Sequence, residues 1–180
     1  MKLLATKIKD CYLVTSTSIN DDRGSFTKIY HRDGFFSQDV DLSFKEQYIS
    51  VSNKNVLRGM HFQLPPYDLS KLITCFSGSV LDVVLDLRVN SPNFLQYDSF
   101  KLIGKDKQTL VVPHGVAHGF ISLEDNSGML YSTTCEYNSN HDEGISWNSF
   151  DFKWPCNKPI LSERDQNHII LSDFKSPFRI

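Results

Sequence analysis

The most informative segment of the sequence is Leu57-Arg58-Gly59-Met60-His61-Phe62-Gln63. It places a cation and a titratable imidazole close together among apolar residues typical of a β-strand. Because side chains alternate along a strand, His61 and Gln63 face the same side, whereas Arg58 faces away unless Gly59 introduces a bulge. Such a site suits anion binding and proton transfer. A single imidazole in a strand is more often a structural residue than a catalyst, so His61 alone proves nothing.

Strand-like segments flank residues 57–63 on both sides. Residues 44–52 have the polar pattern of an edge strand or a ligand-facing strand. Residues 71–76 and 79–88, joined by a Ser-Gly turn, predict an antiparallel pair. One face of the second strand is apolar and belongs to the core, while the other carries aspartates and suits the wall of a polar pocket.

The pattern of the whole chain predicts an all-β fold. Strand-like segments at residues 97–102, 109–112 and 129–137 bring the expected total to about seven to ten short strands. Helical periodicity is limited to short stretches near residues 33–41 and 161–167. With no alternation of strands and helices, a β-sandwich or barrel is expected, as one domain over residues 1–180.

Composition excludes several classes of protein. The 180 residues are 40% apolar and 22% charged, as in ordinary globular proteins. A net charge of −2 gives no general attraction to nucleic acid or to an anionic membrane. The N-terminus lacks the apolar core of a signal peptide, and no apolar run is long enough to span a membrane, so a cytoplasmic location is expected. The four cysteines are widely spaced, which favours free thiols.

Several motifs occur in the order and spacing of one enzyme family. They are Asp22-Arg23-Gly24-Ser25-Phe26, Leu57 to Gln63, Lys71-Leu72-Ile73, Asp82 with Asp86-Leu87-Arg88, Ser91-Pro92, Pro113 with Ala117-His118-Gly119-Phe120, Tyr131 with Tyr137, Trp154-Pro155 and Leu161-Ser162-Glu163-Arg164-Asp165. On these motifs, which cover nearly the whole chain, the protein resembles the dTDP-4-dehydrorhamnose 3,5-epimerases and related nucleotide-sugar epimerases. The resemblance implies a cupin-like jelly roll with a few short helices, a homodimer, and acid–base chemistry in deoxysugar or surface-polysaccharide biosynthesis.

The residue types suit the reaction that this resemblance implies. A 4-keto group acidifies the C–H bonds at C3 and C5 of a hexose, so epimerisation needs a base, a stabiliser for the enolate oxygen and an acid on the opposite face. By resemblance, His61 is the base, Asp165 orients it and Tyr131 is the acid. Lys71, together with Arg58, would stabilise the enolate oxygen.

The resemblance also implies a set of substrate-binding residues: Arg23, Lys28, Glu46, Gln47, Tyr48, Arg58, Gln63, His118, Tyr137, Asp142 and Arg164. The family usually has Glu at the position of Lys28, and Gln-x-Asn where this chain has Glu46-Gln47-Tyr48. Since Lys only donates hydrogen bonds, the nucleobase contacts would differ. A dTDP-linked 4-keto-6-deoxyhexose and a GDP-linked 4-keto sugar such as a heptose therefore both stay open as substrates, and Gln47 would favour dTDP if it reached the pocket.

Other functions of a cupin remain as alternatives. A metal-dependent cupin gathers several histidines and a carboxylate, whereas this chain offers His61, Gln63 and His118, with His114 as an extra, so no required metal or other cofactor is expected. A 3,4-ketoisomerase or a single-centre epimerase could share the scaffold. A non-catalytic sugar-nucleotide-binding cupin would not need His61, Asp165 and Tyr131 together, which favours an enzyme.

Overall fold

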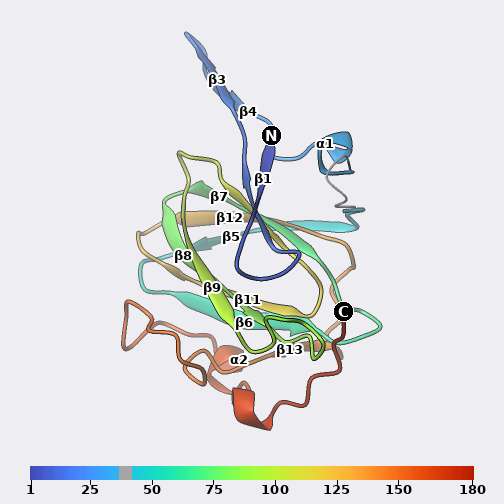
Figure 1. The fold of residues 1–180 in the computed structure, drawn as a ribbon. Coiled ribbons are helices and arrows are strands. Elements are labelled where there is room, and N and C mark those ends of the chain that lie inside the picture. Colours follow the sequence, from blue (N-terminus) through green and yellow to red (C-terminus); the bar gives the residue numbers. More distant parts are fainter. Residues whose placement is uncertain (37–41) are drawn as a thin grey trace.

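Two antiparallel sheets stacked face to face form the body of the molecule (Figure 1). The computed structural model describes residues 1–36 and 42–180. The six-stranded sheet has the order β1 (Lys2–Ala5), β2 (Tyr12–Thr15), β10 (Thr109–Val112), β7 (Lys71–Ser77), β12 (Ser127–Thr133) and β5 (Glu46–Ser52). The five-stranded sheet has the order β13 (Asp142–Gly144), β6 (Leu57–Gln63), β11 (Val116–Ser122), β8 (Ser79–Asp86) and β9 (Tyr97–Ile103). The all-β jelly roll predicted from the sequence is confirmed.

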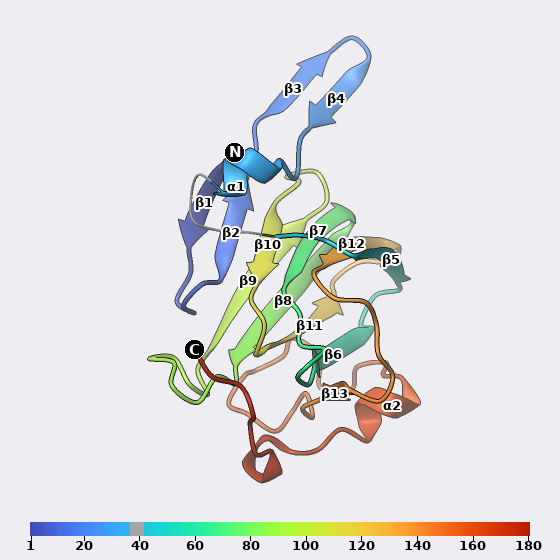
Figure 2. The same cartoon turned by 90° about the vertical axis from the view of Figure 1, so that its right-hand side faces the viewer.

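The remaining elements are short and lie at the margins. The hairpin formed by β3 (Ser18–Asp21) and β4 (Gly24–Thr27) projects from the body of the molecule (Figure 2). The helices are α1 (Arg32–Phe36), α2 (Glu163–Gln166) and the 3₁₀ turn η1 (Leu171–Asp173). Both helical predictions are met in part. Helix α1 overlaps the start of the stretch predicted at residues 33–41, of which residues 37–41 lie outside the described residues. Helix α2 falls within the stretch predicted at residues 161–167.

Two details of the strand prediction were wrong. The described residues form thirteen strands rather than seven to ten, because several have only three or four residues, too few to show alternation. Strands β7 and β8 were expected to pair with each other, but they lie in different sheets. The turn at Gly78, where φ is +66°, passes the chain from one sheet to the other. The partners of each strand are distant in sequence, so the local turn pattern could not reveal them.

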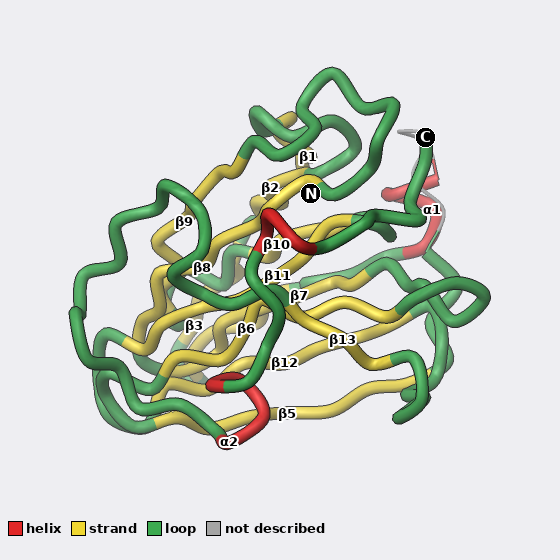
Figure 3. Tube along the Cα trace, turned by 90° about the horizontal axis from the view of Figure 1, so that it is seen from below, coloured by secondary structure: helices red, strands yellow, loops and turns green. Residues whose placement is uncertain are grey.

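Three apolar clusters hold the layers together. The first lies between the sheets and includes Ile73, Val84 and Phe120. A second covers the outer face of the five-stranded sheet, where the C-terminal segment with α2 crosses it (Figure 3), and it includes the expected core face of β8. A third packs Phe35 of α1 and its neighbours on the outer face of the six-stranded sheet. Each fully buried aliphatic or aromatic side chain contributes roughly 1.5–3 kcal/mol.

The irregularity expected at Gly59 is present in β6. The pairing of β6 with β11 shifts register between His118 and Phe120, so that His118 faces His61 and Phe120 faces Arg58. Gly59 has φ of +139°, and a Cβ there would lie 2.4 Å from the Gly119 Cα, so both strands need glycine where they meet. The bulge turns Arg58 to the same side as His61.

None of the helices described is long and apolar enough to cross a membrane.

Candidate active site

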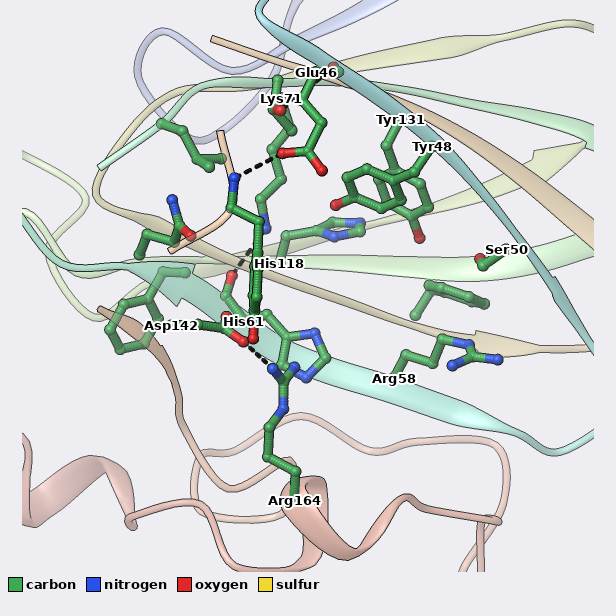
Figure 4. A pocket seen from close by; sticks show the side chains of 16 residues that line it. Glu46, Tyr48, Ser50, Arg58, His61, Lys71, His118, Tyr131, Asp142 and Arg164 are labelled. Atoms are coloured by element: carbon green, nitrogen blue, oxygen red, sulfur yellow. Dashed lines mark hydrogen bonds and ion pairs between the residues drawn. The ribbon is translucent and has the colours of Figure 1, made fainter. Parts of the chain in front are cut away.

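A cavity of about 400 Å³ opens between the two sheets. Its walls come from β5, β7 and β12 on one side and from β6, β11 and β13 on the other (Figure 4). Eleven of the fifteen site residues predicted from the sequence line it: Glu46, Tyr48, Arg58, His61, Gln63, Lys71, His118, Tyr131, Tyr137, Asp142 and Arg164. The predicted grouping of these side chains around one cavity is therefore present.

His61 and Asp165 form a hydrogen-bonded pair at the wall of the cavity to which β6 contributes. The His61 Nε2 and Asp165 Oδ1 atoms are 2.7 Å apart, and the Gly59 amide donates to Asp165 Oδ2 at 3.4 Å. Asp165 is held in place because Ser162 caps α2 and accepts a hydrogen bond from the Asp165 amide at 3.1 Å. A carboxylate at Nε2 places the proton of the neutral ring there and leaves Nδ1 as the free base.

The environment keeps His61 unprotonated at neutral pH. Burial lowers the pKa of His61 from 6.5 to about 4, although the hydrogen bond and charge of Asp165 act in the opposite direction. For Asp165, burial alone would raise the pKa, but the bond with His61 and that from Gly59 hold it below its usual value. The pair is thus a neutral imidazole beside a carboxylate, the state that a general base requires.

Lys71 supplies a buried cation next to the base. Its Nζ donates to the carbonyl oxygen of His61 at 3.1 Å. Burial lowers the pKa of Lys71 to about 8, while Asp142 and Asp82 oppose the shift. At neutral pH most of the ammonium is still protonated and can stabilise an anionic oxygen in the cavity.

Tyr131 lies on the opposite side of the cavity from His61, with His118 between them (Figure 4). Its ring stacks on that of Tyr48, its cross-strand neighbour, at 4.7 Å between centroids and 14° between planes. Burial raises the pKa of Tyr131 well above its usual value, and Tyr48 and Asp82 add to the effect. Tyr131 therefore keeps its proton at neutral pH and can serve as a proton donor.

A second histidine–aspartate pair lies deeper. His118 Nε2 and Asp82 Oδ2 are 2.8 Å apart, and both side chains are buried. The other carboxylate oxygen of Asp82 is buried without a hydrogen-bond partner among the residues described. Burial raises the pKa of Asp82, against the lowering effect of His118. Asp82 was absent from the predicted site, although its place on the pocket face of its strand was a usable signal.

The rim of the cavity carries mixed charge. Arg164 pairs with Asp142, and Glu46 accepts a hydrogen bond from the Tyr137 amide at 2.7 Å. Arg58 donates to the Ser52 hydroxyl at 3.0 Å and forms no ion pair within the described residues 1–36 and 42–180. Its guanidinium is the rim cation best placed to receive an anionic ligand.

Gln63 lines the cavity, but its amide group is occupied. Its Nε2 donates to the Tyr67 and Glu136 carbonyl oxygens at 2.8 and 3.2 Å, and its Oε1 accepts from the Asn138 amide at 2.6 Å. These bonds fix the loops at the cavity mouth. Direct contact of Gln63 with substrate stays a prediction.

Three predicted substrate-binding residues lie outside the cavity of the single chain. Gln47 points away from it, as strand alternation requires, and donates to the Ser132 hydroxyl at 2.8 Å. Arg23 is on the projecting hairpin, paired with Asp21, and Lys28 is exposed just after β4. The register slip that would bring Gln47 into the pocket does not occur, because Glu46 and Tyr48 occupy the inward positions.

Sequence reasoning missed two further polar wall residues and one neighbour of the base. Ser50 and Thr133 share the strand parity of Tyr48 and Tyr131, which was the available signal. His168 lies three positions after Asp165, and its ring meets that of His61 edge-on at 5.4 Å.

His61, Asp165 and His168 are also the set of ligand-type side chains that could approach a metal ion among the described residues, with ligand atoms within 4.8 Å of one another. Two histidines and a carboxylate suit a divalent transition metal. The His61 Nε2 and Asp165 Oδ1 atoms, however, already share a hydrogen bond, which a metal ion would have to replace. The expectation that no metal is required stays a prediction.

Comparison with known proteins identifies the family. A family profile described as dTDP-4-dehydrorhamnose 3,5-epimerase matches residues 5–173. The chain belongs to this epimerase family. It is 36% identical over 177 residues to the dTDP-4-dehydrorhamnose 3,5-epimerase of Escherichia coli (strain K12), covering 96% of both chains. It is 38% identical over 172 residues to the enzyme of that name from Mycobacterium tuberculosis (strain ATCC 25618 / H37Rv), covering 92% of this chain and 85% of the relative.

Solved epimerase structures agree with the fold. The dTDP-4-dehydrorhamnose 3,5-epimerase of Bacillus anthracis, with TDP and PPi bound, matches with a TM-score of 0.92 and 35% identity over 94% of this chain and 99% of that one. The Legionella pneumophila epimerase in complex with dTDP-4-keto-L-rhamnose matches with a TM-score of 0.94 and 26% identity over 99% and 98%. The resemblance drawn from sequence motifs is confirmed, and the chain is an isomerase.

Proposed function

We propose that the protein epimerises a dTDP-linked 4-keto-6-deoxyhexose at C3 and C5 by removing a proton from one face and returning a proton to the other. The observation that carries the proposal is the placement of His61 on β6 and Tyr131 on β12, on opposite walls of one cavity. A base and an acid on facing sheets are what inversion of a carbon centre requires.

The reaction follows from the protonation states of the three groups. The His61 Nδ1 takes the proton as the C–H bond breaks, and the electron pair moves to the ketone oxygen to form an enolate. The Lys71 ammonium stabilises that oxygen. Tyr131 then donates its proton to the other face of the carbon as the ketone re-forms. The His61 imidazolium loses its proton, and the Tyr131 phenolate regains one by exchange with solvent, so no net proton is consumed.

The nucleotide is proposed from both the cavity and the relatives. Arg58 at the rim, which has no carboxylate partner among the described residues, suits the diphosphate. The relative from Bacillus anthracis binds TDP, and the one from Legionella pneumophila binds dTDP-4-keto-L-rhamnose. These complexes favour a dTDP-linked sugar for this chain as well.

A GDP-linked sugar such as a heptose is the second candidate because of the polar residues at the nucleobase end. Glu46 lines the cavity and can accept hydrogen bonds, whereas Lys28 on the outside only donates. A carboxylate could accept from the N–H groups of guanine, which thymine has in smaller number. A direct comparison of the two nucleotides separates these candidates.

We further propose that the active unit is a homodimer. The projecting hairpin exposes Ile19 and Phe26, each at 64%, and β5, which pairs with β12 alone among the described strands, exposes Ile49 at 63%. Exposed apolar side chains beside an open sheet edge favour pairing with a second copy. In such a dimer the hairpin can carry Arg23 toward the partner's cavity. Sedimentation at micromolar concentration showing only monomer would contradict this proposal.

The experiment that tests the function is deuterium incorporation from D₂O into dTDP- and GDP-linked 4-keto-6-deoxysugars and a GDP-linked 4-keto-heptose, followed by mass spectrometry and NMR. We expect label at C3 and C5 of the dTDP sugar with wild-type protein and none with His61→Asn. Label at a single centre would reduce the assignment to a mono-epimerase. Label only in a GDP-linked sugar would show that the substrate carries GDP instead of dTDP. Measurable binding without label would indicate a non-catalytic cupin.

A further inference from the structure

His168 is an ionisable residue beside the base that the reaction above does not use. Its side chain is only 7% exposed, and its Nε2 lies 4.0 Å from Asp165 Oδ1, the oxygen that also bonds to His61. Its Nδ1 is buried with no hydrogen-bond partner in the described part of the chain. A buried imidazole with one nitrogen unpaired is unfavourable for folding, which calls for a reason to keep it there.

The fold holds His168 in this position. The backbone on its C-terminal side is fixed by a bridge between Ile145 and Ile169, with the Ser146 amide donating to the Ile169 carbonyl oxygen at 2.8 Å. The imidazole packs directly on Gly144, where an added Cβ would come within 2.3 Å of the ring. Gly144 therefore leaves the space that the ring occupies, and a larger residue there would displace it from Asp165.

The proton on His168 follows from its neighbours. The Nε2 faces a carboxylate, so the neutral ring carries its proton on Nε2 and leaves Nδ1 bare. Burial lowers the pKa of His168. The negative charges of Asp165, Asp142 and Glu143 oppose this shift, whereas the charge of Arg164 adds to it. His168 is accordingly neutral at pH 7, and its Nε2 lies 4.0 Å from the oxygen that serves His61.

We propose that His168 is a positioning residue that acts through Asp165: its Nε2–H competes with His61 for the same carboxylate oxygen and limits the basicity that Asp165 gives to His61. At 4.0 Å the N–H is an electrostatic competitor rather than a hydrogen-bond donor of ordinary length. A weaker base returns its proton faster after each turnover, which suits an enzyme that must reset His61 between two carbon centres.

The charged groups around the pair are few and are left intact by the test. Arg164 Nε lies 3.7 Å from the same Asp165 oxygen, and Lys71 lies against the His61 backbone on the cavity side. Asp142 and Glu143 approach His168 from β13. Variants at His168 and Gly144 change none of these side chains, so a change in His61 can be assigned to the competing N–H.

The test is an NMR titration of the His61 imidazole, identified by its absence in His61→Asn. His168→Leu keeps a similar volume and removes the N–H, and we expect the His61 midpoint to rise by about 0.5 pH unit or more. His168→Gln keeps an N–H at the Nε2 position, and its midpoint should stay within about 0.2 pH unit of wild type. Gly144→Ala, which displaces the ring, should shift the midpoint in the same direction as His168→Leu.

An unchanged or lowered His61 midpoint in His168→Leu would overturn the proposal and leave His168 as packing alone. Equal shifts in the Leu and Gln variants would do the same, because the N–H would not be the cause. Although the inference builds on the proposed role of His61, the titration needs no substrate, so it succeeds or fails independently of the activity. With an active substrate, the acid limb of kcat/KM should move in parallel with the NMR midpoint.

Discussion

Two histidines that line the same cavity are each paired with an aspartate at nearly the same separation, 2.7 Å for His61 with Asp165 and 2.8 Å for His118 with Asp82. The two pairs differ in how far their side chains are exposed to the cavity and solvent. The His61 side chain is 24% exposed, whereas that of His118 is 5% exposed and Asp82 is completely buried. Pairing with a carboxylate is common to both, so we infer that the greater exposure of its side chain is what suits His61 to the proposed role of base.

The two aspartates also come from different parts of the chain. Asp82 belongs to β8, in the middle of the five-stranded sheet, while Asp165 is on the short helix α2 that packs beneath the same sheet. The buried pair is built from two neighbouring strands of one sheet, and the more exposed pair is assembled from a strand and a separate C-terminal segment. We infer that the first contributes mainly structure and the second chemistry.

The largest expected effect comes from removing each histidine in turn. His61→Asn should lower solvent deuterium incorporation by about 10³-fold or more, because it removes the imidazole nitrogen that takes the proton. His118→Asn should retain incorporation within about 100-fold, since it changes the cavity wall but not the base. Both rates come from mass spectrometry of the same substrate in D₂O. Comparable losses in the two variants would remove the distinction between the pairs.

Stability should show the reverse order. His118→Leu leaves Asp82 buried without its partner and should lower the free energy of unfolding by about 3–5 kcal/mol. His61→Leu should lower it by only about 1 kcal/mol, because Asp165 keeps the Gly59 amide and nearby Arg164. Urea denaturation at pH 7 measures both. Adding Asp82→Asn to His118→Leu should recover part of the loss, and its failure to do so would argue against a charge effect.

Part of this site was accessible from the sequence because strand alternation is a local rule. Once residues 57–63 were taken as a strand, the shared side of His61 and Gln63 followed, and Gly59 signalled the bulge that brings Arg58 in. The family motifs added Tyr131 and Asp165, which no local pattern connects to His61. The same alternation rule excluded Gln47 once Glu46 and Tyr48 faced inward.

The features of the fold and site that the sequence did not predict depend on contacts between segments distant in the chain. The separation of β7 and β8 into different sheets is set by partners far along the chain, so the Ser-Gly turn looked like a hairpin. Arg23 and Lys28 match motif positions, but the single chain leaves them outside the cavity. His168 reaches Asp165 only because Gly144, from another strand, leaves room for its ring.

The acid opposite the base offers a smaller, sharper test. Tyr131→Phe should lower inversion by about 10²- to 10³-fold while deuterium still enters at the original configuration, because His61 can exchange its proton with solvent and return it to the same face. Tyr48→Phe is the matched control, since it keeps the stacked ring and should stay within about tenfold of wild type. NMR separates exchange with retention from inversion. Loss of exchange in Tyr131→Phe would mean that the phenol is needed for proton removal as well.

The smallest expected effect is the pH dependence of stability that belongs to His61. Its pKa is about 4 in the folded protein and 6.5 as an ordinary imidazole, so between these values the unfolded chain binds more protons. Stability linked to His61 is therefore fully present above pH 6.5 and is lost as the pH falls toward 4, by about 1–3 kcal/mol in total. The difference in unfolding free energy between wild type and His61→Asn, measured by urea denaturation from pH 7 to pH 4, isolates this contribution because His168 titrates in both proteins. A difference that stays constant over this range would show that His61 is not held neutral by burial, and the contrast with the deeper pair would then rest on access alone.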